Sequence, residues 1–223
     1  MTLPRNALAL TVLMALGLLA SVAYAAHAMQ PLNDYRFWAL LVLAVVTARL
    51  KVKLPGLTGN MAVNLPFLLI AVAQLSMLEA LLVALPSCGV QCFPKGGGRP
   101  KPVQMIFNLS TTGVAVAAAS LIGTHFALLA AAGYFLAQTV PVACIIGFTE
   151  GGAIHKIWYG IAHCSFPFYV LSAGIASMAT SSTTQLSWQA PLLCLPVLYA
   201  IYRSYEFYFR VPSIVRGEAQ QGK

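Results

Sequence analysis

Few side chains in this chain of 223 residues could do chemistry, because its polar groups stand singly inside long hydrophobic runs. A polar group in hydrocarbon is costly, so each one is a candidate binding residue. The amides and carboxylates in or beside these runs are Asn64, Gln74, Glu79, Gln91, Asn108, Gln138 and Glu150. We expect Asn64, Glu79 and Asn108 to contact a ligand if these three side chains converge on one pocket.

Glu79 has two competing interpretations. Ser76 stands three residues before it, which is the spacing of a capping box at a helix start. A carboxylate in the first turn also interacts favourably with the positive end of the helix dipole. The sequence therefore favours a cap over a ligand contact at Glu79. Glu150, before Gly151 and Gly152, is interpreted as another cap or as a charge at headgroup level.

Asn108 begins a stretch of small and hydroxyl-bearing residues that extends to Ser120. Such residues let helices approach closely and hydrogen-bond to one another, so helix packing is the favoured interpretation. Asn64 lies in an earlier apolar segment that also follows a basic connection. Because lone amides in hydrocarbon need partners, we predict that Asn64 and Asn108 approach each other. The alternative is that Asn64 lines a polar pocket.

The remaining reactive residue types form no catalytic pattern. His155 and His163 are eight residues apart, and no pair of acidic residues accompanies them. The five cysteines lie in or against apolar segments, which predicts buried thiols and not a disulfide framework. Cys88 and Cys92 could share a helix face as a soft-metal pair, but small apolar packing is favoured because no third ligand is near. We therefore expect no catalytic residue, metal, cofactor or enzymatic activity.

Eight apolar segments must position these residues. They are Ala7–Ala26, Tyr35–Leu50, Met61–Leu75, Leu78–Phe93, Val103–His125, Ala127–Phe148, Ser165–Met178 and Trp188–Tyr205. If the N-terminus is cytoplasmic, every Lys and Arg except Arg36 falls on the cytoplasmic side, where basic residues are enriched. We predict an all-α integral membrane protein, a polytopic bundle of about eight transmembrane helices with both termini in the cytoplasm.

The composition supports one transmembrane domain over residues 1–210 and a short cytoplasmic tail over 211–223. Hydrophobic residues make up 59% of the chain and charged residues only 8%, against roughly a quarter charged in soluble domains. The net charge of +8 comes from basic residues beside apolar runs. We therefore expect these residues to face anionic headgroups of a lipid bilayer and not nucleic acid.

Two parts of this topology have open alternatives. Arg5, the apolar run after it and Ala23-Tyr24-Ala25 match a cleaved secretory signal, but the run is long enough to span, which favours an uncleaved helix. The segments 61–75 and 78–93 are short, so they either cross fully or re-enter on the same side.

Residues Gly152–His163 differ from their neighbours. Ile154, Ile157, Trp158 and Ile161 form a helical apolar stripe, which predicts a short helix in the cytoplasmic interface. Pro167 would then stand near the start of the next helix, where it costs little. We expect this helix and the tail to contact a protein partner, through Lys156, Trp158 and Arg210.

Several short motifs together suggest a family. They are Arg49–Gly56 with Val63-Asn64, Gln104–Asn108, Thr149–Gly151 before Lys156–Trp158, Ser165–Tyr169 and Leu198–Tyr205. Over about residues 36–210 the chain resembles the N-terminal multi-spanning input region of bacterial HD-GYP phosphodiesterases and GGDEF cyclases. No HD pair, GYP or GGDEF motif is present, so we expect a version of the membrane region without the output domain.

The resemblance implies a non-enzymatic sensory or signal-input module in the bacterial inner (plasma) membrane. It would act through a cytoplasmic signalling partner or as a homodimer. The alternative function is a small-molecule transporter or uptake subunit with a pocket at Asn64, Glu79 and Asn108.

The charge distribution makes the topology testable. Alkaline phosphatase fused after Lys223 should be inactive, because both termini are predicted to be cytoplasmic. The same enzyme inserted between Ser181 and Gln185 should be active, and an insertion between Lys95 and Lys101 should be inactive. The reverse pattern of activity would overturn the eight-segment model.

Overall fold

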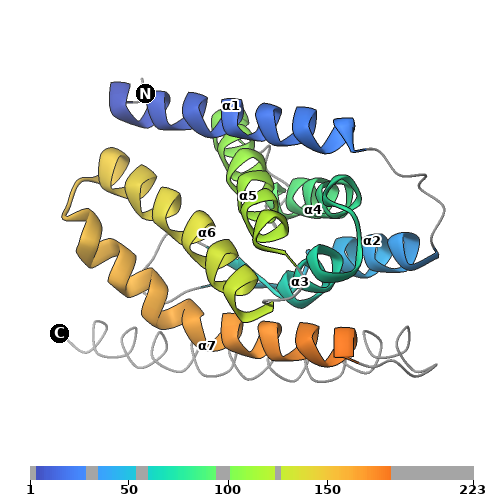
Figure 1. Ribbon diagram of the computed structural model, residues 1–223. Helices are drawn as coiled ribbons and strands as arrows, with labels where there is room; N and C mark the ends of the chain where they lie inside the picture. The colour runs from blue at the N-terminus through green and yellow to red at the C-terminus, as the bar shows by residue number, and fades with distance from the viewer. Residues whose placement is uncertain (1–3, 29–34, 54–59, 94–100, 124–126, 182–223) are drawn as a thin grey trace, which may run out of the picture.

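The computed structural model describes residues 4–28, 35–53, 60–93, 101–123 and 127–181. In these ranges the chain forms seven helices and one short pair of strands (Figure 1). The helices are α1 (Arg5–His27), α2 (Tyr35–Thr47), α3 (Leu65–Gln74), α4 (Met77–Cys92), α5 (Pro102–Ile122), α6 (Ala127–Glu150) and α7 (Ile154–Ser181). Strands β1 (Lys51–Lys53) and β2 (Asn60–Ala62) were not predicted; they pair antiparallel, with Val52 opposite Met61.

Four helices are long and apolar enough to cross a membrane. They comprise Arg5–His27, Pro102–Ile122, Leu128–Glu150 and Ile154–Ala179. Large apolar side chains on α1, among them Leu13, Leu16 and Leu19, are more than half exposed. Such a surface suits contact with lipid, and these features are those of a helical membrane protein.

Seven of the eight predicted segments correspond to α1 through α7, and the eighth, Trp188–Tyr205, lies outside the described residues. The helices α2, α3 and α4 are short, with 13, 10 and 16 residues. At 1.5 Å per residue α3 is about 15 Å long, half the roughly 30 Å of the hydrocarbon core. Helix α3 therefore cannot cross by itself. The number of crossings and the side of each terminus stay predictions.

The interfacial helix predicted over Gly152–His163 is not a separate element. Helix α7 starts at Ile154 and continues to Ser181, so Pro167 lies inside it and not near its start. Membrane helices tolerate an internal proline because neighbouring groups satisfy the freed backbone carbonyl. The chain reverses between α6 and α7 at Gly151 and Gly152, whose φ angles of 79° and 112° favour glycine.

Packing against α6 explains why the start of α7 is not left at the interface. The indole Nε1 of Trp158 donates to Thr139 Oγ1 of α6 at 3.1 Å. Further along, the Phe135 ring lies edge-on to Tyr169, with centroids 4.9 Å apart, and to Phe166 at 6.2 Å. The apolar stripe of the predicted interfacial helix thus belongs to a helix–helix contact.

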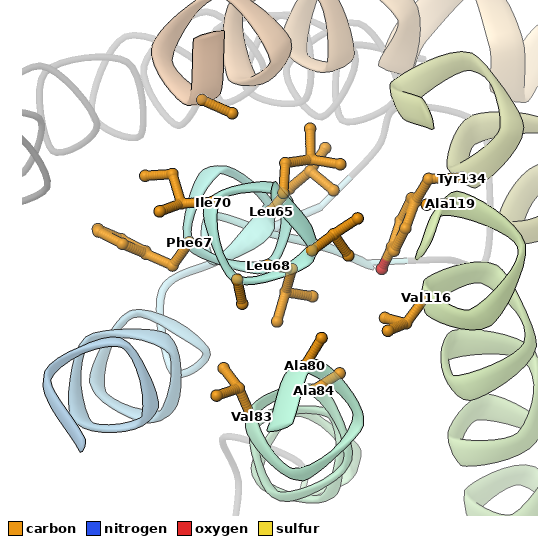
Figure 2. Close-up of a cluster of buried hydrophobic side chains, with 14 of the residues drawn as sticks. Leu65, Phe67, Leu68, Ile70, Ala80, Val83, Ala84, Val116, Ala119 and Tyr134 are labelled. Atoms are coloured by element: carbon orange, nitrogen blue, oxygen red, sulfur yellow. The ribbon is translucent and has the colours of Figure 1, made fainter. Parts of the chain in front are cut away.

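Helix α3 lies at the centre of the bundle. Every residue from Leu65 to Val72 is buried, and Phe67 and Ile70 are fully buried, as expected for a helix that is apolar all round. Figure 2 shows the α3 side chains pointing to different sides, with α4 on one side and α5 and α6 on another. Helices α2 and α7 also pack against α3.

Burial around α3 predicts a large stability effect at its centre. Replacing Ile70, which is 0% exposed, by Ala should destabilise the fold by about 2–5 kcal/mol, because the cavity cannot close completely. Leu13, 64% exposed on α1, is a matched control whose replacement by Ala should change little. Thermal unfolding in detergent measures both variants. Equal losses would show that α3 is not the packed centre.

Candidate functional site

Glu79 forms a helix cap at the start of α4. The backbone N–H and the hydroxyl of Ser76 both donate to Glu79 Oε2, at 2.9 and 2.7 Å, and Glu79 N–H donates to Ser76 Oγ at 3.4 Å. The predicted capping box is confirmed. Glu79 is 8% exposed and Ser76 is half-buried, so the cap lies at the edge of the buried interior.

Polar side chains on the second half of α4 form one connected set with polar side chains at the start of α3 and on α5. We call this set the α4 polar cluster; its members are Asn64, Ser87, Cys88, Gln91, Cys92, Asn108 and Thr112. Four hydrogen bonds between these residues join α4 either to the start of α3 or to α5. The cluster is therefore the polar contact between three helices.

One row of the cluster faces the start of α3. Gln91 Nε2 donates to Asn64 Oδ1 at 2.8 Å, and Asn64 Nδ2 donates to Ser87 Oγ at 3.1 Å. Ser87 Oγ in turn donates to the Ala84 carbonyl at 2.8 Å. Asn64, only 3% exposed, uses both its donor and its acceptor, so this row is a continuous chain of hydrogen bonds.

The other row faces α5. Thr112 Oγ1 donates to Cys88 Sγ at 3.4 Å, and Asn108 Nδ2 donates to Cys92 Sγ at 3.8 Å. Both cysteines and both donors are four residues apart on their own helices, a spacing that puts side chains on one helix face. The match of the two spacings brings two thiols and two donors together along the α4–α5 contact.

The position of these donors along α5 sets the depth of the cluster. Asn108 and Thr112 lie six and ten residues beyond Pro102, the first residue of this 21-residue helix, which corresponds to about 9 and 15 Å. If α5 crosses the hydrocarbon core, Thr112 is near its middle and Asn108 is closer to one surface. Water is scarce at that depth, so the partners must come from protein.

The residues predicted to bind a ligand contact different parts of α4. The hydrogen bonds of Asn64 and Asn108 both go to α4, Asn64 to Ser87 and Gln91 and Asn108 to Cys92, so the approach of these two amides to each other stays a prediction. Glu79 is eight residues before Ser87 on α4, about 12 Å along the helix axis. Asn64 and Asn108 thus flank one half of α4, and Glu79 caps the other end.

The residues predicted to contact a partner have different surroundings. Lys156 is exposed, whereas Trp158 is half-buried and bonded to Thr139 of α6. Arg210 lies outside the described residues. Contact of these residues with a partner stays a prediction.

Sequence reasoning did not consider Ser87. It named Gln91 only as one of several polar candidates and Thr112 only as part of a helix-packing stretch, and for Cys88 and Cys92 it favoured packing over a soft-metal pair. The available signal was a repeated spacing of four, Ser87 with Gln91, Cys88 with Cys92, and Asn108 with Thr112. That spacing indicates a shared face on each helix, but it does not show which faces meet.

Comparisons of the chain with protein-family models, with curated proteins and with solved structures find no match. Within the described ranges, no three His, Cys, Asp or Glu residues gather closely enough to hold a metal ion together. The chemistry that the described residues bring together is therefore that of the α4 polar cluster: amides, hydroxyls and a pair of thiols.

The row facing α3 makes a prediction about stability. Asn64→Leu should cost about 1–3 kcal/mol, because it removes the acceptor of the half-buried Gln91 amide and the donor to the buried Ser87 hydroxyl. The double variant Asn64→Leu with Gln91→Leu should recover part of this loss, because both partners are then apolar. Thermal unfolding in detergent provides the measurement.

Gln104 is the matched control, an exposed amide near the start of α5. Gln104→Leu should leave the unfolding temperature unchanged within error. Additive losses from Asn64→Leu and Gln91→Leu would contradict a direct hydrogen bond between the two residues.

Proposed function

We propose that this chain is a non-enzymatic signal-input module of the bacterial inner membrane, with about eight transmembrane helices and both termini in the cytoplasm. It senses a change in or near the membrane and passes it on through a cytoplasmic partner or a second copy of itself. The observation that carries the proposal is that side-chain hydrogen bonds join the two ends of α3 to two different helices, α4 and α7.

The first connection is made by hydrogen bonds of the α4 polar cluster. Asn64 directly precedes α3 and is bonded to Ser87 and Gln91 of α4. The second connection is at the C-terminal end of α3. There Gln74, its last residue, donates from Nε2 to the Ala179 carbonyl of α7 at 3.0 Å. In the proposed mechanism a displacement of α4 is passed through α3, which is buried from Leu65 to Val72, to the end of α7.

This arrangement supports signal input because it connects the interior to α7, the last described helix. In the predicted topology Lys156 lies at the cytoplasmic start of α7 and Ala179 lies near its periplasmic end, so in this proposal a shift at Ala179 passes along α7 to the cytoplasmic partner. Lys156 and Tyr159 are exposed on α7, and they give the proposed partner a surface on the same helix.

One observation favours the alternative, a small-molecule transporter. Helix α3 is a short half-helix, and the backbone before it is strand and turn beside the polar cluster. Transporters build substrate sites from interrupted helices of this kind, with non-helical backbone lining a cavity. Here, however, the amide of Asn64 is already bonded to protein groups on both its oxygen and its nitrogen.

Photocrosslinking in membranes tests the proposal. Benzoylphenylalanine placed at Lys156 should form an adduct either with a differently tagged second copy or with a cytoplasmic protein that carries a kinase, cyclase or phosphodiesterase domain. The matched control is the same group at Leu13, an exposed position on α1, which should give lipid adducts only.

Transport assays supply the opposing result. The purified chain in liposomes should show no counterflow of labelled amino acids or sugars. If counterflow occurs and depends on Asn64, and if Lys156 and Leu13 give the same adducts, the signalling role is wrong and the chain is a transporter.

A further inference from the structure

The two thiols of the α4 polar cluster are placed as a pair. Cys88 and Cys92 stand one turn apart on α4, where Cβ atoms are about 5–6 Å apart, and the Cys88 side chain is close enough to Cys92 to hydrogen-bond to it. Cys88 is 3% exposed, and Cys92 is half-buried at the last residue of the helix. An ion would therefore meet Cys92 first and Cys88 deeper in the protein.

We propose that Cys88 and Cys92 bind a soft monovalent metal ion of the Cu(I) class between their sulfur atoms. Thiolates are the protein ligands that select Cu(I), and Cu(I) accepts two of them in a linear arrangement. Zn(II) normally takes four protein ligands in structural sites, and the described residues gather no third His, Cys, Asp or Glu here. The geometry therefore suits a two-coordinate ion.

The neighbouring donors fit this chemistry. Binding removes one proton from each thiol, releases two protons to water, and leaves a complex of one Cu(I) and two thiolates with a net charge of −1. Thr112 Oγ1 and Asn108 Nδ2 already donate to the two sulfur atoms, and hydrogen bonds to a charged group stabilise its charged form. These donors would hold the thiolates in place and tune the ion's affinity.

The site also lies beside the hydrogen bonds between α4 and Asn64, because Ser87 and Gln91 are the direct chain neighbours of Cys88 and Cys92. An ion that draws the two sulfur atoms together would act on this half of α4. Its role as the stimulus rests on the proposed function, whereas the binding site itself does not.

Competition with a chromophoric Cu(I) chelator tests the site on the purified full-length chain in detergent, with ascorbate as the reductant. The variant Cys144→Ser/Cys164→Ser/Cys194→Ser retains only the proposed pair and should still take one ion per chain from the chelator. Adding Cys88→Ser or Cys92→Ser to it should abolish that uptake. Thr112→Val, which removes a donor and keeps the shape, should weaken affinity by about tenfold.

Two further measurements keep the proposal falsifiable if a serine variant fails to fold. X-ray absorption of the copper-loaded chain should show two sulfur ligands, and Cu(I) should protect Cys92 of the native chain from maleimide. Uptake that survives loss of both cysteines, nitrogen or oxygen ligands in the spectrum, or no uptake by the native chain would overturn the site. Photocrosslinking from Lys156 is independent of these results, so failure of the metal site and failure of the signalling role are distinguishable.

Discussion

A polar side chain among apolar helices must find its hydrogen-bond partner within the protein, because hydrocarbon offers none. In this chain helix α4 supplies several of those partners. Its first turn satisfies Glu79 through Ser76, and its second half satisfies Asn64, Asn108 and Thr112. Because these bonds have fixed directions, they set the rotation of α4 and with it the faces that α3 and α5 present.

The central position of α3 depends on this arrangement. A helix that is apolar on every side gains no orientation from amphipathicity, so its packing alone allows several rotations. Asn64 before the helix and Gln74 at its end remove that freedom by bonding to α4 and α7. Three buried polar atoms in the described ranges, Thr111 Oγ1, Ser120 Oγ and Gln138 Oε1, have no partner. They lie on α5 and α6, two helices that pack against each other.

The sequence was sufficient for properties that depend on composition or on short spacings. Hydropathy located seven segments that are helices, and the spacing of Ser76 and Glu79 predicted the capping box. It failed where the outcome depends on which helix faces meet. Asn64 and Asn108 were expected to approach each other because both are lone amides, but the sequence did not indicate that each would bond to α4, because that depends on the register of α4 against its neighbours. Similarly, the stripe containing Trp158 was assigned to lipid headgroups, although α6 provides the surface that it packs on.

The burial of α3 also bears on the choice between a transporter and a signal-input module. Alternating access requires one part of a protein to rock against another around the substrate site. Helix α3 contacts α2, α4, α5 and α7 at once, so moving it relative to any of them would disturb a close-packed interface. A sensor needs much less displacement, because small shifts at packed interfaces are sufficient to bias a two-state element. A buried helix bonded at both ends can transmit such a shift from α4 to α7 without opening a path across the membrane.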